Sequence, residues 1–580
     1  MTNRIFLYLL ILCVCSSCKE DQPIADMVLI NGEIATVDSE NPEAEAIAFK
    51  EDRIIHIGTT EAIQVFVGEK TKVIDLKGKF AMPGIIEGHG HFSSIGSTLQ
   101  NLNFIKSKSW DEIVAMVAEK AKTMKPGEWI IGRGWHQEKW EGSLDRQVFG
   151  YPYNDKLNQV APNNPVLLGH ASGHGLMANQ AAMDLAGVSK ETPNPNGGEI
   201  VRNSRGEAIG VFEETAMGII NNAYDDYLAT LSEEDKARIW YEGIELAEEE
   251  CIKKGITSFQ DAGSTFVEID RYQKLAEEEE LDLRLWAMIG SREENLAENL
   301  KRFPILNAGN HFFTSRAIKG YLDGALGSFG AWLLESYNDK PNFHGQNVTP
   351  IKEIERIAGL AAENNLQYCV HAIGDRGNRE MLDLFEKIFK TMPDESDFRW
   401  RIEHSQHIDP ADIPRFGELG IIAAMQAIHC TSDAPFVIKR LGEKRAREGA
   451  YPWRSLLDAG AIVTNGTDAP VEDVDPLDSF YASVTRKRTD SGMAFFPEQS
   501  MTREEALRAY TMSNAYAAFE EQDKGSLEVG KLADVTVLSK NLLTCTDDEI
   551  LDAEVLYTII GGKVKFENTN GLEERIGSRE

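Results

Sequence analysis

Long hydrophobic runs, positive charge and cysteine are all scarce in this sequence. Beyond the first 18 residues, no apolar stretch approaches the length of about 20 residues that a membrane-spanning helix needs. Lysine and arginine number 60 against 93 aspartates and glutamates, and the net charge of −33 argues against nucleic acid as a partner. Three of the seven cysteines lie in the first 18 residues, and the others are Cys251, Cys369, Cys430 and Cys545. Their wide spacing excludes a disulfide framework or zinc ribbon and predicts buried free thiols.

The first 18 residues have the pattern of a secretory signal. One arginine precedes a short apolar run from Ile5 to Val14, and small residues follow as far as Cys18. The Cys-Ser-Ser-Cys ending resembles a bacterial lipobox, although Cys15 stands where leucine is usual. We therefore predict a lipoprotein signal peptide over residues 1–17 and a lipid anchor at Cys18, in a bacterial cell envelope, either periplasmic or surface-facing. An ordinary signal peptide and an uncleaved anchor are the alternatives.

Short strands separated by turns are predicted near both ends of the chain. "MVLINGEIATV" and "KVIDLKGKFAMPG" show this pattern near the start, and "KGSLEVGKLADVTVLS" and "VLYTIIGGKVKFE" show it near the end. Two half-sets of strands at opposite ends of one chain predict a single small domain. We expect a composite β-sandwich built from residues 26–82 and 523–567.

Strands and helices alternate between these two regions. In one unit, Ser232 with Asp235 predicts the N-terminal cap of a helix, and Gly255 predicts its C-terminal cap. The predicted core strands lie at 81–87, 256–261, 283–289, 317–322, 367–372, 399–404, 421–426 and 461–466. Eight such units imply an α/β fold, a (β/α)8 TIM barrel over residues 83–522. The segment at about 100–230 is too long for a loop and predicts an inserted subdomain after barrel strand 1.

Ionisable residues stand at the ends of five predicted strands. In a TIM barrel, the carboxyl ends of the strands form the functional face. The residues are His89 and His91 at strand 1, Lys319 at strand 4, His371 at strand 5, His404 at strand 6 and Asp468 at strand 8. Each alone has an ordinary explanation, such as a hydrogen-bonded core histidine or a turn-forming aspartate. Together they predict a metal site, because burying so many unpaired polar groups is costly and because histidine and carboxylate are common metal ligands.

The order HxH, Lys, His, His, Asp resembles the amidohydrolase superfamily in its two-metal form. The flanking segments "WIIGRGWHQEKW", "GHGLMANQAAMDLAGV", "IKGYLDGALGS", "HAIGDRGN" and "RIEHSQHI" are similar to the amidohydrolase family 3 branch, often called YtcJ-like, over about residues 27–565. The resemblance implies hydrolysis of a non-peptide carbon–nitrogen bond in a small-molecule substrate by a metal-activated hydroxide. N-acyl amines, N-formyl amines and cyclic amides are the substrate classes that it implies.

The resemblance also implies a role for each residue. The more buried of two divalent metal ions would be held by His89, His91 and Asp468, and the second by His371 and His404. Lys319 would bridge the ions as a carbamate formed with CO2; zinc is the default metal, with manganese and iron as alternatives. Asp468 would also be the catalytic residue that moves a proton from the attacking hydroxide to the leaving nitrogen. The candidates for substrate binding are Trp135, His174, Asp323, Gln426 and His429.

Two positions depart from the family pattern. Glu87 stands before HxH where aspartate is usual, and we expect it to keep the negative charge beside the ligands. Ser172 stands where the branch usually has aspartate, which removes one negative charge from the substrate side. Packing alone could explain Trp135, and a loop position alone could explain His429.

Two other functions remain open at this point. A mononuclear deaminase of the same superfamily would carry glutamate three residues after the strand-5 histidine, where this chain has Gly374. A surface lipoprotein that binds a solute without catalysis would be favoured by an incomplete ligand set, and here the set is complete. A homodimer is the assembly we expect.

Overall fold

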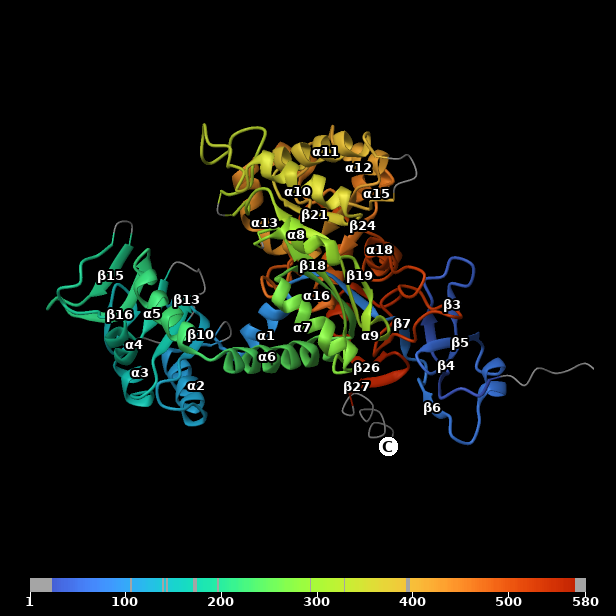
Figure 1. Ribbon diagram of the computed structural model, residues 1–580, viewed down its shortest axis with the longest axis horizontal. Helices are drawn as coiled ribbons and strands as arrows, with labels where there is room; N and C mark the ends of the chain where they lie inside the picture. The colour runs from blue at the N-terminus through green and yellow to red at the C-terminus, as the bar shows by residue number, and fades with distance from the viewer. Residues whose placement is uncertain are drawn as a thin grey trace, which may run out of the picture.

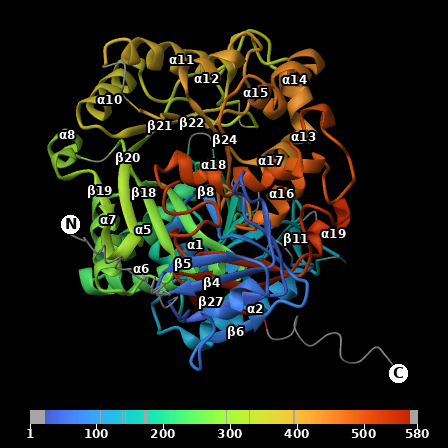
Figure 2. The ribbon, with the colours of Figure 1, turned by 90° about the vertical axis from the view of Figure 1, so that its right-hand side faces the viewer.

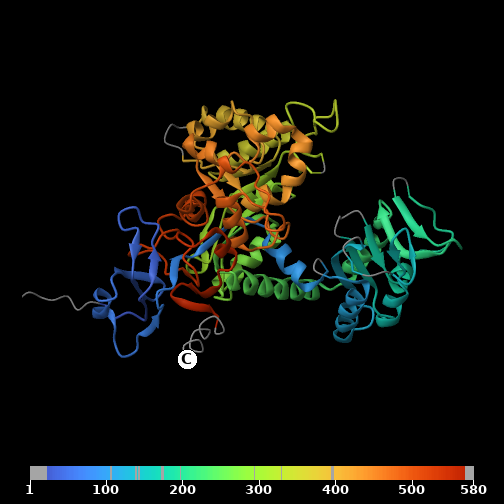
Figure 3. The ribbon, with the colours of Figure 1, turned by 180° about the vertical axis from the view of Figure 1, so that it is seen from behind.

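The computed structural model describes residues 23–568 except 105–106, 138–139, 142–143, 171–174, 196–197, 293, 328 and 393–396. The predicted signal peptide, Cys18, Ser172 and His174 lie outside the described residues. Within the described part of the chain, no helix has both the length and the apolar character that crossing a membrane requires. A barrel lies between a strand-rich region and the insertion, which are on opposite sides of it (Figures 1 and 3).

Parallel strands form the barrel. They are β8 (Ile85–Gly90), β17 (Ile256–Ser264), β18 (Arg284–Gly290), β20 (Phe313–Tyr321), β21 (Gln367–Ala372), β22 (Arg401–His404), β23 (Ile422–Met425) and β24 (Val463–Asn465). Each is hydrogen-bonded in parallel to the next in this order, and β19 (Ile305–Asn307) adds antiparallel to β20. The predicted (β/α)8 barrel is confirmed, and a strand lies at each of the eight predicted places.

Helices cover the outside of the barrel. The longer ones are α6 (Glu233–Lys253), α7 (Phe266–Glu277), α10 (Ile351–Glu363), α11 (Asp375–Phe389), α12 (Ile413–Leu419), α13 (Ala427–Leu441), α14 (Glu443–Gly449), α16 (Pro476–Thr485) and α17 (Arg503–Ala509). Shorter ones are α8 (Leu296–Asn299), α9 (Ala308–His311), α15 (Trp453–Asp458), α18 (Met512–Ala517) and α19 (Asp547–Leu551). Ser232 caps α6 by accepting the Asp235 amide at 3.0 Å, and Gly255 follows the helix with a φ of +82°. Both predicted caps are therefore confirmed.

The seam between β24 and β8 is bridged by a side chain. Asn514 in α18 is fully buried, and its Nδ2 donates to Ile86 O in β8 at 2.6 Å and to Asn465 O in β24 at 2.8 Å. Just beyond the strands, Asp468 N donates to His89 O at 2.8 Å. Each bridged carbonyl lies three residues before a predicted metal ligand. The seam therefore fixes the positions of His89 and Asp468 relative to each other.

Strands from both ends of the chain share one sheet. Its order is β27 (Lys563–Glu567), β26 (Val555–Ile560), β25 (Val535–Leu538), β7 (Phe80–Pro83), β2 (Glu33–Ala35) and β3 (Glu43–Ala44). A second sheet contains β5 (Arg53–Gly58), β4 (Ala46–Lys50), β1 (Met27–Ile30) and β6 (Lys72–Asp75). Apolar residues of both sheets form one hydrophobic core. Figure 2 shows this region in front of the barrel.

One predicted strand boundary is wrong. Residues 81–83 were assigned to barrel strand 1, but they lie in β7, which pairs with β25 in the register Pro83 to Val535 and Phe80 to Leu538. The barrel strand begins only at Ile85. The pairing partner is more than 450 residues away, and the local sequence pattern that predicts a strand contains no information about it.

The insertion has a sheet and hydrophobic cores of its own. It contains α1 (Phe92–Gln100), β9 (Leu102–Asn103), α2 (Trp110–Thr123), β10 (Ile130–Trp135), β11 (Gln147–Val148), β12 (Tyr151–Pro152), α3 (Asp155–Val160), β13 (Val166–His170), β14 (Gly175–Ala178), α4 (Gln180–Leu185), β15 (Gly198–Arg202), β16 (Ala208–Glu214) and α5 (Met217–Thr230). Its main sheet runs β15–β16–β14–β13–β10–β9 over separate apolar clusters. Helix α1 leaves the barrel directly after His91, and α6 returns to it. The two helices cross so closely that a Cβ on Gly96 would lie 2.1 Å from Gly243 O.

Candidate active site and metal centre

One carboxylate oxygen faces both His89 of strand β8 and His91, which follows the strand. Asp468 Oδ1 lies 3.6 Å from His89 Nε2 and 3.2 Å from His91 Nε2. From β20, Lys319 reaches the same place, with its Nζ 3.2 Å from His89 Nε2. The backbone of Asp468 is in the left-handed region, with a φ of 58°, a conformation that non-glycine residues adopt mostly where the surrounding structure requires it. The seam of the barrel therefore aims this carboxylate at two predicted ligands, His89 and His91.

The histidines of β21 and β22 lie against this group. The ring centroids of His371 and His404 are 4.4 Å apart, and those of His89 and His404 are 4.8 Å apart. His404 also has a left-handed backbone, with a φ of 74°. The structure therefore brings together all six residues that were predicted as metal ligands.

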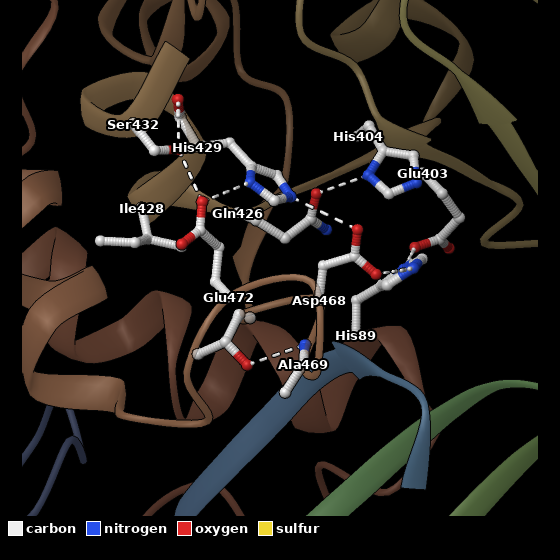
Figure 4. Close-up of polar contacts among 12 residues, drawn as sticks. His89, Glu403, His404, Gln426, Ile428, His429, Ser432, Asp468, Ala469 and Glu472 are labelled. Atoms are coloured by element: carbon white, nitrogen blue, oxygen red, sulfur yellow. Dashed lines mark hydrogen bonds and ion pairs between the residues drawn. The ribbon is translucent and has the colours of Figure 1, made fainter. Parts of the chain in front are cut away.

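A buried ion pair holds the ring of His89. Its Nδ1 makes a short contact with Glu403 Oε2 (Figure 4), and Glu403 Oε1 lies 2.7 Å from Arg401 Nε. Burial disfavours the Glu403 carboxylate, but Arg401 and then His89 outweigh this effect and hold its pKa below the usual range. Because Nδ1 donates to a carboxylate, the lone pair of His89 Nε2 faces Asp468 and Lys319.

The side-chain amide of Gln426 holds Nδ1 of His404, as Glu403 holds Nδ1 of His89. His404 Nδ1 is 2.7 Å from Gln426 Oε1, and Gln426 Nε2 donates to Ala424 O at 3.1 Å. The second bond fixes which end of the amide faces the histidine, so Nδ1 is the donor and Nε2 carries the lone pair. Burial lowers the pKa of His404 and His371 well below the usual range and that of His89 to about 4, which keeps these rings neutral and able to ligate a cation.

His429 contacts the outer oxygen of Asp468. Its Nε2 lies 3.3 Å from Asp468 Oδ2, and its Nδ1 lies 3.5 Å from Glu472 Oε1, which also accepts the Ser432 hydroxyl at 2.6 Å (Figure 4). Burial disfavours charge on His429, but the two carboxylates outweigh it and raise its pKa to about 10. The same contact helps to hold the pKa of Asp468 well below its usual range, despite burial. Because both nitrogens of His429 face carboxylates, this ring is better suited to donate hydrogen bonds than to ligate.

The ligand atoms fit divalent cations. His89, His91 and Asp468 offer three ligand atoms within 4.8 Å of one another, and so do His404, His429 and Asp468. Asp468 Oδ1 is buried and accepts no hydrogen bond among the described residues, although it faces two histidine nitrogens. Lone pairs from imidazoles and a carboxylate that point at one place are the donor set that zinc and similar metals prefer.

Lys319 is buried beside these ligands. Its side chain is 1% exposed, and burial lowers the pKa of its amine. An ammonium group here would repel the cations that the neighbouring ligands attract. The uncharged amine, which burial favours, is also the form that can react with CO2.

Glu87 is buried beside the predicted ligands. It lies two residues before His89 and is fully buried, with Oε1 accepting the Thr467 amide at 2.6 Å. Burial raises its pKa to about 8. The expectation that Glu87 keeps a negative charge stays a prediction.

The predicted substrate-binding residues have different surroundings. Gln426 contacts His404, and His429 contacts Asp468, as described above. Asp323 is 2% exposed, and its carboxylate accepts the backbone amides of Trp332 at 2.8 Å and of Ile373 and Gly374 at 2.9 Å each. It ties the loop after β20 to the end of β21 and faces His371 Nε2 at 3.6 Å.

Trp135 lies in the insertion. Its ring is 1% exposed within the core between α2 and the sheet, and its Nε1 donates to Leu168 O at 2.7 Å. The ring stacks edge-on against His170 at 4.6 Å. The structure does not bring Trp135 to the metal ligands, because its apolar ring and its N–H are both satisfied inside the insertion.

The carboxylates that hold the histidines were not predicted. Glu403 directly precedes a ligand inside a strand that is otherwise buried, and an acidic residue in such a strand is the signal that could have identified it. Glu472 follows Asp468 in "TDAPVED", where several acidic residues conceal which one faces the site. Carboxylates of this kind orient ligating histidines and tune their basicity.

A TIM barrel with histidine and aspartate ligands at the ends of its strands is the architecture of a metal-dependent hydrolase. The model of the amidohydrolase family matches residues 72–566, most of the chain, and this chain belongs to that family. The predicted resemblance is therefore confirmed. Fold, site and family together make the protein a metal-dependent amidohydrolase with a small-molecule substrate.

Similar proteins come from plants, bacteria and archaea. Protein LONG AFTER FAR-RED 3 of Arabidopsis thaliana is 32% identical over 93% of this chain and 91% of its own. An N-substituted formamide deformylase of Arthrobacter pascens is 27% identical over 94% of this chain and 99% of its own. The crystal structure of an uncharacterized metal-dependent hydrolase from Pyrococcus furiosus superposes with a TM-score of 0.71, at 25% identity, over 89% of this chain and 100% of that one.

Proposed function

We propose that this protein hydrolyses a non-peptide carbon–nitrogen bond in a small amide with the help of two divalent metal ions. The observation that carries the proposal is the position of Asp468, which contacts His89 and His91 through one oxygen and His429 through the other, beside Lys319. The relative named as an N-substituted formamide deformylase makes N-formyl amines the first substrates to test, followed by N-acyl amines and cyclic amides.

The metal ions would be held as the resemblance implies. His89, His91 and Asp468 would hold one, His371 and His404 the other, with zinc as the first choice for imidazole and carboxylate ligands. When bound, the ions would lower the pKa of a water molecule and polarise the carbonyl oxygen of the amide. Lys319 would bridge them as a carbamate: its neutral amine adds to CO2, one N–C bond forms and one proton is released to solvent.

The chain's own residues would move the protons. Asp468 takes the proton of the attacking hydroxide and delivers it to the leaving nitrogen as the carbon–nitrogen bond breaks. His429 holds the outer oxygen of this carboxylate, so the inner oxygen keeps its orientation during the transfer. Glu403 and Gln426 keep the Nε2 atoms of their histidines available as ligands.

A deaminase is disfavoured by the space around Gly374. A Cβ at this position would lie 2.1 Å from Trp332 O, so the glutamate that such deaminases carry there cannot be accommodated without moving the backbone. The neighbouring Asp375 opens helix α11, and its carboxylate is engaged by the Leu334 amide at 2.8 Å. Two-metal hydrolysis therefore remains the better proposal.

Lipidation at Cys18 and a place in a bacterial cell envelope are a second proposal, which the N-terminal sequence alone supports. The short apolar run and the Ser-Ser-Cys sequence that ends it are its basis. A homodimer stays a prediction.

The decisive experiment is metal analysis of the protein without residues 1–17, followed by a substrate screen. The metal-loaded protein should contain two divalent ions per chain and release amine from N-formyl or N-acyl amines only while metal is bound. Asp468→Asn serves as the inactive control. A metal-free protein, or metal binding without hydrolysis of any amide, carbamate or cyclic amide, would favour the non-catalytic binding lipoprotein.

A further inference from the structure

Two metal-site histidines use the same nitrogen for support but have partners of different charge. Nδ1 of His89 contacts the carboxylate of Glu403, whereas Nδ1 of His404 contacts the neutral amide of Gln426 at 2.7 Å. Both contacts are buried, with Glu403 at 0% and Gln426 at 2% exposure. The difference between them is therefore not screened by solvent.

Glu403 is held as an anion by its surroundings. Arg401 contacts it with Nε at 2.7 Å and with Nη2 at 3.1 Å. The other hydrogen bonds of Arg401 are with neutral acceptors, Gln260 Oε1 at 2.6 Å and Gly88 O at 2.9 Å. Glu403 is therefore the carboxylate that pairs with this guanidinium, and the pair lies beside His89.

Gln426 is also held in place, but it is neutral. Its Nε2 donates to Ala424 O at 3.1 Å, so the amide oxygen stays directed at His404 Nδ1. It orients the ring as well as a carboxylate would, but it brings no negative charge. His404 is therefore the less basic ligand of the two, because an anionic acceptor on one imidazole nitrogen increases electron donation from the other.

We propose that the two metal positions load in a fixed order, first and more tightly at His89, His91 and Asp468, then at the position of His371 and His404, and that Glu403 and Gln426 set this order. The inference rests on the proposed two-metal function. Asp468 strengthens the order, because its carboxylate belongs to the first position, whereas the second position has only histidines besides the Lys319 carbamate. Glu403 and Gln426 are positioning residues, which act on the metals through the histidines.

Metal titration of the apoprotein tests the order directly. Metal is removed by dialysis against a chelator, and Zn²⁺ is added back in bicarbonate buffer in competition with a chromophoric chelator of known affinity. The wild type should show two steps whose dissociation constants differ by at least about tenfold. Glu403→Gln, which keeps the shape and the acceptor but loses the charge, should weaken the first step about 10–100-fold. Gln426→Glu should tighten the second step by a factor of similar size.

Glu248→Gln is the matched control. Glu248 is also buried, at 7% exposure, but it accepts the backbone amides of Asp282 and Leu283 and contacts no predicted ligand. Its replacement should leave both steps unchanged. Circular dichroism and thermal unfolding of each apoprotein show whether the variants are folded.

The outcomes separate this inference from the proposed function. Two steps of equal affinity in the wild type, or an unchanged first step in folded Glu403→Gln, would overturn the loading order and leave two-metal hydrolysis intact. If Glu403→Gln does not fold because Arg401 loses its partner, Gln426→Glu decides, and an unchanged second step overturns the inference. A wild type that binds no zinc, or a single ion, would overturn the two-metal function itself.

Discussion

Asp468 combines two roles that a substitution can separate. Asp468→Asn keeps an oxygen that can ligate, and the predicted histidine ligands remain, so most of the metal should stay bound. The proton acceptor is lost, and kcat should fall by about 10²–10⁴, the usual contribution of general-base catalysis. Activity and metal content are measured on the same purified sample. Asp478→Asn, on helix α16, is the control and should retain activity; near-normal turnover in Asp468→Asn would place the proton acceptor elsewhere.

The chemistry proposed for Lys319 differs from that of an ordinary lysine, because the side chain would become an anionic carbamate. Lys319→Ala should lose bound metal and activity together, because the bridging anion is gone, and acetate or propionate should restore part of both by filling the space. Lys319→Arg should stay inactive, since a guanidinium keeps its charge and forms no carbamate. Lys524, another buried lysine, which pairs with Glu520 at 2.7 Å, supplies the control Lys524→Ala. Full metal content in Lys319→Ala would exclude a bridge at this position.

The ligands could be predicted from the sequence, but their partners could not. His89, His371 and His404 occupy strand ends, which an apolar strand followed by histidine marks locally. Glu403 and Gln426 act through contacts between strands that are distant in sequence, and Gln426 was instead assigned to the substrate. The free thiols Cys251, Cys369 and Cys430 are buried as predicted, and Cys545 is partly exposed.

The seam between β24 and β8 depends on one side chain from helix α18. Asn514→Ala would leave two buried carbonyls, those of Ile86 and Asn465, without their donor. An unsatisfied buried group costs about 1–3 kcal/mol, so the variant, with two such groups, should lose roughly 2–6 kcal/mol of stability in urea unfolding. Metal affinity should fall with it, since His89 and Asp468 follow these carbonyls. Asn222→Ala, at an exposed position of α5, should change neither quantity. Wild-type stability in Asn514→Ala would show that the seam closes without this bridge.

Helix α6 carries a buried carboxyl that should make stability depend on pH. Burial raises the pKa of Glu248 from 4.5 to about 7 in the folded chain, despite its two backbone donors. The folded chain thus holds this proton more tightly than the unfolded chain, so the contribution of Glu248 is greatest below pH 4.5 and is lost as pH rises through 7. The difference corresponds to at most about 3 kcal/mol. The free energy of unfolding of Glu248→Gln, relative to that of the wild type, should therefore increase by about 1–3 kcal/mol from pH 5 to pH 8 in urea unfolding. That of exposed Glu245→Gln should not. A constant difference across this range would contradict the assignment.

Barrel strands were predictable because they are buried on both faces and appear as local apolar runs between helices. The first was misplaced at its start, since residues 80–83 pair with Val535–Leu538 and only that distant pairing assigns them to another sheet. The closure through Asn514 was not predictable for the same reason. The sequence around a polar residue in a short helix does not indicate which carbonyl groups its side chain will donate to.

The arrangement of the whole chain places the catalytic face away from the terminal strands. Helix α1 begins at the ligand end of β8 and leads into the insertion, while β7 precedes the opposite end of the same strand and belongs to the sheet of both termini (Figure 1). The insertion therefore joins the barrel at the ligand end of β8. Its residue Trp135 was predicted to bind substrate from a motif alone, and a motif does not specify how far an inserted unit lies from the site.

Cys18 should determine whether the protein is attached to the membrane. Residues 5–14 are apolar but too few to span a bilayer, Ser16-Ser17-Cys18 follows, and charged "KED" comes next, an order typical of a lipoprotein signal. Cys18→Ala removes the sulfur that would carry the lipid, so the variant should accumulate as an unprocessed precursor or appear in the soluble fraction. Cys15→Ala, three residues earlier in the same run, is the matched control and should be processed and retained. Membrane fractionation with immunoblotting measures both quantities. A Cys18→Ala protein that is processed normally and stays with the membrane would show that attachment does not depend on this cysteine.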